Sequence, residues 1–162
     1  MKRTLHILFA ALAAMILLPA TMMAFPVDHV YYTISDGTLT ISGEGPMDDY
    51  LDYGKCPWYE SIARGEDDVT EVTKIIIEEG ITHIGDYAFE DAVDVTSVTL
   101  PSSLESIGEH AFAYMNSLSE ITIPENVSSI GDGAFKYCSS LTEIVIPENV
   151  TSIGDDAFNI CI

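Results

Sequence analysis

The sequence predicts a β-rich repeat solenoid of stacked, short parallel strands, with one helical turn per repeat and a β-hairpin cap at the N-terminal end. A phrase of 23 residues recurs through the last 91 residues, and Ile-Gly and Ala-Phe pairs recur at fixed places within it. A fixed period of about 20–50 residues is typical of solenoids, in which each coil packs only against its neighbours. The predicted repeats are residues 72–94, 95–117, 118–140 and 141–162.

Residues 1–24 have the order of a secretory signal peptide. Lys2 and Arg3 precede an apolar run over residues 5–18, and small residues follow it. An uncleaved membrane anchor is the alternative, but Pro19 interrupts the run before the ~20 residues that a bilayer span needs. We therefore expect a secreted, extracellular or cell-surface protein with no membrane insertion after cleavage, at a site that the sequence leaves open.

The chain is strongly acidic, with 26 Asp and Glu against 6 Lys and Arg and a net charge of −20. Removal of the signal peptide takes two of the basic residues and makes the charge more negative. Such a surface repels phosphate backbones, which excludes nucleic acid as a partner and favours a partner with basic groups. Solubility alone is the simpler explanation of the charge.

Residues 25–71 lack the repeat and are predicted to cap the first coil. In VYYTISDGTLTISGEG, Asp36-Gly37 lies between two alternating apolar segments, which is a strong signal for a two-residue β-hairpin loop. The segment CPWYESI then supplies the only tryptophan of the chain. We expect this tryptophan to cover the first coil.

Each phrase is expected to begin with a strand. Apolar side chains at its first, fourth and sixth positions point inward, as Leu118, Ile121 and Ile123 show for the third phrase. Proline ends the strand, and a second extended piece leads to the Ile-Gly pair, where glycine turns the chain. An acidic residue then caps a helical turn that buries the Ala-Phe pair. These acidic residues are Asp86, Glu109, Asp132 and Asp155.

The combined pattern LxxIxIPxxVxxIGxxAFxxC resembles that of the BspA-type leucine-rich repeats of secreted and surface proteins of microbes. The resemblance covers residues 72–162, with departures at Glu78, where proline is usual, and at Ala92 and Met115, where cysteine is usual. The leader GTLTISGEG…PWY also resembles the caps of such arrays. The resemblance implies a leucine-rich-repeat solenoid, extracellular placement, adhesin-like binding to host or microbial proteins, and no catalytic residues.

The outward positions of the predicted strands form the candidate binding surface. They combine β-branched residues with an acidic edge and contain no aromatic ring, so platforms for stacking sugars or bases are missing. A protein or peptide ligand with basic groups fits this surface better, although strand propensity alone also accounts for its Thr, Val and Ile residues. The outward residues are Lys74, Ile76, Ser97, Thr99, Glu120, Thr122, Glu143 and Val145.

No catalytic, cofactor or metal site is predicted. Neither an HExxH motif nor a G-x-S-x-G elbow is present, and His29, His83 and His110 are interpreted as exposed polar residues. The recurrent acidic residues are interpreted as caps rather than as calcium ligands.

Cys138 and Cys161 lie one repeat apart. Buried free thiols are favoured there over a disulfide, because in-register side chains point parallel to each other. Asn126 and Asn149 match the glycosylation pattern as a feature of the repeat.

The chain stops at Ile162, one residue short of a complete fourth phrase and without a predicted C-terminal cap. Either the array continues in a longer protein or another chain covers this coil, and we expect self-association through it. The leading hypothesis is a non-catalytic protein-binding module. The alternative is a structural fragment or stalk of a longer repeat protein whose activity lies elsewhere.

Overall fold

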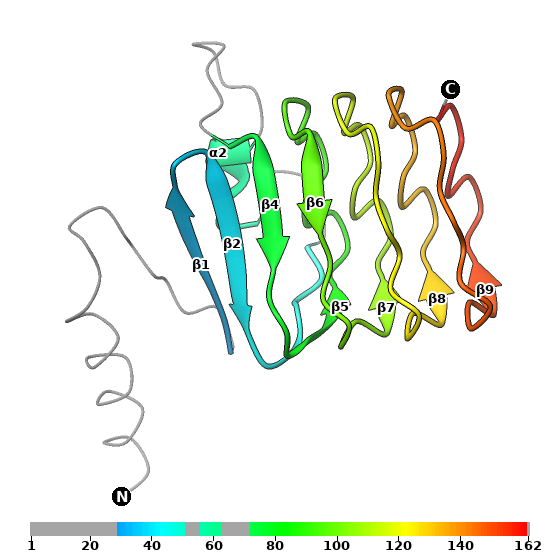
Figure 1. Cartoon of the computed structure of the whole chain (residues 1–162), viewed down its shortest axis with the longest axis horizontal. Helices are drawn as coiled ribbons and strands as arrows, with labels where there is room; N and C mark the ends of the chain where they lie inside the picture. Colours follow the sequence, from blue (N-terminus) through cyan, green and yellow to red (C-terminus); the bar gives the residue numbers. More distant parts are fainter. Residues whose placement is uncertain (1–28, 51–55, 63–71, 162) are drawn as a thin grey trace, which may run out of the picture.

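The computed structural model describes residues 29–50, 56–62 and 72–161, in which the chain winds into coils that stack along one axis (Figure 1). The predicted signal peptide, part of the predicted cap and Ile162 lie outside the described residues. Among the helices in these ranges, none has the length and apolar character needed to cross a membrane.

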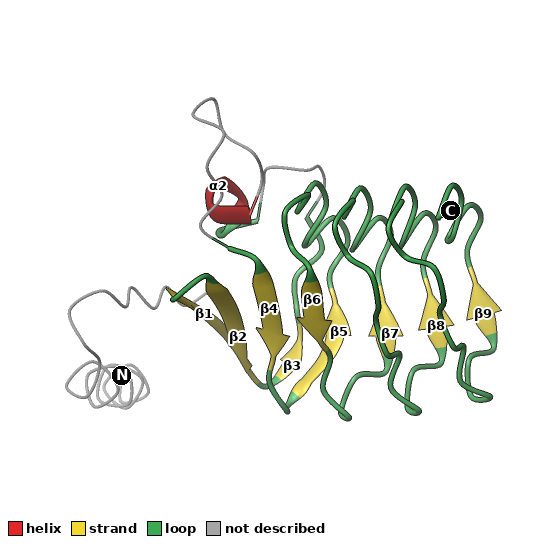
Figure 2. Cartoon of the chain, turned by 45° about the horizontal axis from the view of Figure 1, so that its top comes forward, coloured by secondary structure: helices red, strands yellow, loops and turns green. Residues whose placement is uncertain are grey.

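Two sheets run along the stack. The first has the order β1 (Val30–Ser35), β2 (Thr38–Gly43), β4 (Lys74–Ile77) and β6 (Ser97–Thr99). The second has the order β3 (Gly45–Pro46), β5 (Ile81–Ile84), β7 (Ser106–Ile107), β8 (Ser129–Ile130) and β9 (Ser152–Ile153), and it continues along one side of the molecule (Figure 2). Apart from the β1–β2 hairpin, all described strand pairs are parallel. The predicted repeat solenoid is thereby confirmed.

The predicted N-terminal hairpin is present. Strands β1 and β2 pair antiparallel around Asp36 and Gly37, whose φ angles of 50° and 73° are both left-handed, as a type I′ turn requires. Strand β2 then pairs in parallel with β4, so the hairpin covers the first repeat by extending its sheet.

Residues 38–50 also form a short coil of their own, which the repeat pattern does not reveal. After β2, the chain enters β3, which pairs with β5 of the first phrase. Further along, the N–H of Met47 donates to the carbonyl of His83 at 3.1 Å, and that of Tyr50 donates to Asp86 at 3.0 Å. The stack therefore begins one coil before the first recognisable phrase.

The strand expected at the start of every phrase forms only in the first two. Residues 118–124 and 141–147 have no strand, although Ile121, Thr122 and Ile123 keep the predicted alternation of buried and exposed side chains. Proline removes one donor for pairing but does not decide the outcome, because the second phrase forms β6 with Pro101 at the same position. At the equivalent position of the first phrase, the N–H of Glu78 donates to the carbonyl of Ile41 at 2.9 Å, whereas the other three phrases have prolines there and lack this donor.

The helical turn expected after each Ile-Gly pair is a chain of tight turns instead. Tyr87 and Asp91 have positive φ angles of 58° and 60°, which no α-helix contains. Alternate N–H groups point to the next coil: those of Tyr87, Phe89 and Asp91 donate to carbonyls of the second phrase at 2.8, 2.9 and 3.0 Å. The segment therefore forms a further ladder between coils.

A column of aromatic rings fills the centre of the stack. Phe89, Phe112 and Phe135 are fully buried, with ring centroids 5.5 and 5.3 Å apart. Phe158 continues the column at 5.5 Å from Phe135. Trp58, which precedes the described helix α2 (Tyr59–Ile62), stacks on Phe89 at 5.6 Å and donates from Nε1 to the carbonyl of Ala88 at 2.7 Å. The tryptophan thus covers the first ring of the column.

Candidate functional site

The outward residues predicted as a binding surface lie on one face of the solenoid, which we call the strand face. This face is formed by β4, β6 and the segments 118–124 and 141–147. Six of its eight predicted residues are exposed, among them Val145 at 69%, and Ile76 and Ser97 are half-buried. The structure therefore brings the predicted residues together on one surface.

A hollow of about 670 Å³ lies on the strand face where the first sheet ends at β6. In the described part of the chain, neither strand pairing nor a backbone hydrogen bond joins residues 97–100 to residues 120–123. The edge of β6 that faces the third phrase is therefore an unpaired strand edge, which is a template for the backbone of another segment.

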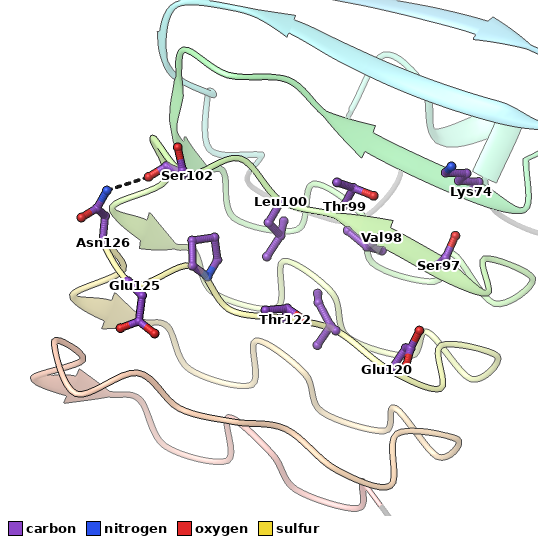
Figure 3. A pocket seen from close by; sticks show the side chains of 12 residues that line it. Lys74, Ser97, Val98, Thr99, Leu100, Ser102, Glu120, Thr122, Glu125 and Asn126 are labelled. Carbon is purple, nitrogen blue, oxygen red and sulfur yellow. Dashed lines mark hydrogen bonds between the residues drawn. The ribbon is translucent and has the colours of Figure 1, made fainter.

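The floor of the hollow is apolar and its ends are polar. Val98 and Leu100 are only partly buried, whereas their counterparts Ile75 and Ile77 in the first phrase are fully enclosed. Figure 3 shows Glu120 near one end, with Ser97 between it and Lys74, and Glu125 near the other end. An apolar floor with carboxylates at both ends suits a ligand that has apolar and basic groups.

Sequence reasoning found only part of the lining. Of the predicted residues, Lys74, Ser97, Thr99, Glu120 and Thr122 line the hollow, while Ile76, Glu143 and Val145 lie on the strand face outside it. The residues missed are Val98, Leu100, Ser102, Ile121, Pro124, Glu125 and Asn126. Three of these, Val98, Leu100 and Ile121, were missed because their positions in the phrase point inward. The others lie at or just after the proline that ends the strand, and this proline was the sequence signal that could have identified them.

The asparagines of the glycosylation pattern have structural roles. The side-chain amide of Asn126 donates to the carbonyl of Ser102 at 2.7 Å, as the dashed line in Figure 3 marks. That of Asn149 donates to the carbonyl of Glu125 at 2.8 Å. Each asparagine therefore joins its coil to the preceding one, which explains why it recurs with the repeat.

Asp86 and Asp132, two of the acidic residues after the Ile-Gly pairs, link coils rather than cap helical turns. Oδ1 of Asp86 accepts the N–H of Glu109 at 2.6 Å, and Oδ1 of Asp132 accepts that of Asp155 at 2.8 Å. Oδ1 of Asp49, in the preceding coil, accepts the N–H of Asp86 in the same manner. Burial raises the pKa of the Asp86 carboxyl, and the nearby carboxylates of Asp49 and Glu109 raise it further.

Two of the three histidines outside the predicted signal peptide differ from their predicted exposed state. His29 is exposed, but His83 and His110 are half-buried. The ring of His83 lies 2.7 Å from Ser106 Oγ through Nδ1 and 3.1 Å from Asp49 Oδ1 through Nε2. His110 stacks on Tyr87 at 5.2 Å and has its Nδ1 3.2 Å from Oε1 of Glu90. Sequence spacing missed these contacts because the partners lie in other coils.

The cysteines are free thiols, as the sequence favours. The Sγ atoms of Cys138 and Cys161 donate in parallel to the carbonyls of Phe112 and Phe135, at 3.1 and 2.9 Å. Burial raises the pKa of both Cys56 and Cys138 to about 12. Since the thiolate is the reactive form, these two residues are poor nucleophiles at neutral pH.

The family model described as BspA type leucine rich repeat region (6 copies) matches residues 67–162. A leucine-rich repeat protein from Eubacterium ventriosum is similar in structure, with 30% identity and a TM-score of 0.62 over 83% of this chain and 40% of that one. One from Bacteroides ovatus is 28% identical, with a TM-score of 0.59 over 77% of this chain and 35% of that one. This chain thus spans less than half the length of either protein. No curated protein matches the sequence.

Proposed function

The chain belongs to the BspA-type leucine-rich repeat family, and from this we propose that it is a secreted or cell-surface, non-catalytic module that binds a protein or peptide through its strand face. The observation that carries the proposal is the hollow beside β6, with its apolar floor and its acidic ends. Adhesin-like attachment to host or microbial proteins is the role that such a surface would serve. The signal-peptide pattern of residues 1–24 supports the extracellular placement.

The partner that fits the hollow is an extended segment with alternating apolar and basic side chains. Such a segment adds its backbone to the unpaired edge of β6 and directs alternate side chains towards Val98 and Leu100. Its basic side chains meet Glu120 and Glu125. The net charge of −20 speeds the approach of a basic partner at low ionic strength.

A non-catalytic role agrees with the chemistry of the strand face. The hollow is lined by Lys74, Asn126, serines, threonines, glutamates and apolar residues, and it contains neither a histidine nor a cysteine. It therefore lacks the two side chains that most often serve as general base and as activated nucleophile in covalent catalysis.

The proposal can be tested with a fluorescent ten-residue peptide that alternates lysine and valine. We expect saturable binding to the chain, followed by fluorescence anisotropy, and about tenfold weaker binding to the double variant Glu120→Lys, Glu125→Lys, which reverses the two carboxylates of the hollow. Two reversed charges turn attraction into repulsion, and a tenfold change corresponds to about 1.4 kcal/mol. A peptide that alternates glutamate and valine should not bind.

A matched control keeps the same change of net charge away from the strand face. The double variant Glu44→Lys, Asp155→Lys reverses two exposed carboxylates outside the hollow and should bind the lysine peptide nearly as well as the original chain. Circular dichroism verifies that both variants keep the fold. Equal weakening in the two variants, or in neither, would show that the strand face is not the binding surface.

A structural segment of a longer repeat protein is the second candidate function. It is supported by the solved relatives, of which this chain spans 40% and 35%. In that role the chain spaces or presents an activity that lies in other parts of the protein. Self-association through the last coil, where Ile153 and Ile160 are 49% and 53% exposed, is a further proposal, and size-exclusion chromatography tests it by showing a dimer or a monomer.

A further inference from the structure

Three side chains with metal-binding atoms meet beside the second sheet. Asp49 follows β3, His83 lies in β5, and Asp86 follows Gly85 in the same phrase. One donor atom from each residue lies within 4.8 Å of the donor atoms of the other two. The cluster therefore offers one imidazole nitrogen and two carboxylate oxygens to a common point, and it is separate from the strand face.

The backbone holds these residues in place. Strand β3 pairs with β5, and the N–H groups of Met47 and Tyr50 donate to the carbonyls of His83 and Asp86 at 3.1 and 3.0 Å. The N–H of Asp86 donates to Oδ1 of Asp49 at 3.1 Å. Donor atoms on segments that are held by backbone hydrogen bonds between two coils lose little conformational entropy when an ion binds.

The imidazole of His83 has a partner on its other side. Its Nδ1 lies 2.7 Å from Oγ of Ser106 in the next coil, while its Nε2 lies 3.1 Å from Oδ1 of Asp49. In the tautomer whose Nδ1–H donates to Ser106, the lone pair of Nε2 is directed at the Asp49 carboxylate, and a cation between the two atoms is favourable. Metal-ligating histidines commonly donate their second N–H in this manner.

We propose that Asp49, His83 and Asp86 bind one Zn²⁺ ion, with water completing a tetrahedral coordination. Ca²⁺ takes six to eight oxygen ligands, whereas Zn²⁺ accepts imidazole nitrogen and carboxylate oxygen at about 2.0–2.2 Å. Ligand atoms in a tetrahedron of that size are about 3.4 Å apart, close to the 3.1 Å between His83 Nε2 and Asp49 Oδ1. The two carboxylates balance the charge of the ion.

The equivalent positions in the other coils have carboxylates but no imidazole. The positions equivalent to His83 hold Ser106, Ser129 and Ser152. In the last two phrases the N–H of Asp155 donates to Oδ1 of Asp132 at 2.8 Å, which repeats the link between Asp86 and Asp49 without a nitrogen ligand. The Asp132–Asp155 pair is therefore an internal control for binding by stacked carboxylates alone.

Isothermal titration of the chain with ZnCl₂, after removal of metal with EDTA, tests the site. We expect one equivalent of Zn²⁺ to bind and a millimolar excess of Ca²⁺ to leave this binding unchanged. His83→Ala should weaken it at least tenfold, and Ser106→Ala should weaken it about tenfold through the orientation of the ring. Asp132→Asn should retain it.

The decisive comparison is between His83→Ala and Asp132→Asn. Equal binding by the two variants would overturn the proposal, as would displacement of Zn²⁺ by Ca²⁺ or the absence of saturable binding to the original chain. If His83→Ala does not fold, His83→Gln serves in its place, with circular dichroism as the check. Substitution by Co²⁺ gives an independent readout, because a tetrahedral site with a nitrogen ligand produces visible absorption bands that His83→Gln should lose.

Discussion

The two sides of the solenoid differ, although the same phrase builds both. On the side of the second sheet, β5, β7, β8 and β9 pair without interruption. On the strand face the pairing stops after β6, and a hollow lies beside that edge. The comparison indicates that one side of the phrase is constrained by contact between coils, while the other side is free to vary in sequence.

The constraint comes from the close approach of backbones at the Ile-Gly pairs. A Cβ atom added at Gly131 would lie 2.6 Å from the backbone nitrogen of Glu109, so a side chain does not fit there. On the strand face, the prolines of the last three phrases remove a backbone donor instead. The outward residues there change from Lys74 to Ser97, Glu120 and Glu143, as expected of positions that the coil does not fix.

The largest expected effect separates the shared core from the strand face. Phe112→Ala removes a fully buried ring from between Phe89 and Phe135 and should lower the free energy of unfolding by about 3–5 kcal/mol. Thr122→Ala, on the exposed strand face, should change it by less than about 0.5 kcal/mol. Urea denaturation measures both. Similar losses of unfolding free energy in the two variants would show that the strand face is as tightly constrained as the core.

A smaller effect is expected at the glycine that the close backbone contact requires. Gly131→Ala forces adjacent coils apart and should cost about 1–3 kcal/mol, as overpacking does elsewhere. Glu120→Ala in the same phrase adds no such clash and is the control. Stability of Gly131→Ala within about 0.5 kcal/mol of the original chain would mean that the coils can separate there as they do on the strand face.

The smallest effect concerns Glu79, whose carboxylate joins the first two phrases beside the strand face. Glu79 accepts the N–H groups of Ser102 and Ser103 at 2.8 and 3.1 Å, and these hydrogen bonds lower the pKa of its carboxyl below 4.5. A lowered pKa in the folded state stabilises the fold above the ordinary pKa, and this contribution disappears as the pH falls through the lowered value.

Glu79→Gln should therefore unfold at a lower urea concentration than the original chain near pH 7, because it lacks the charge. The difference should shrink towards pH 2, where the carboxyl of Glu79 is protonated. Urea midpoints at the two pH values measure the effect. If the difference between the two urea midpoints does not change with pH, Glu79 stabilises the fold through its shape and packing rather than through its charge.

Local patterns predicted the elements that depend on neighbouring residues. Asp36-Gly37 predicted the hairpin, and the recurring Ile-Gly and Ala-Phe pairs predicted the stacked coils and their buried column. The prediction of a helical turn was wrong, because the N–H groups of Tyr87 and Phe89 donate to carbonyls of the next coil instead of to their own segment. The prediction that Asp86 caps a helical turn was wrong for the same reason, since its carboxylate accepts a hydrogen bond from the next coil.

The sequence by itself determined the period, the inward side chains and the strongly acidic surface, because each of these depends on residue type and spacing along the chain. Only the tertiary structure decided that pairing on the strand face stops at β6 and that Asp49 lies beside His83. Both results depend on distances between coils. Such distances follow from the packing of the whole stack and are not present in any one phrase.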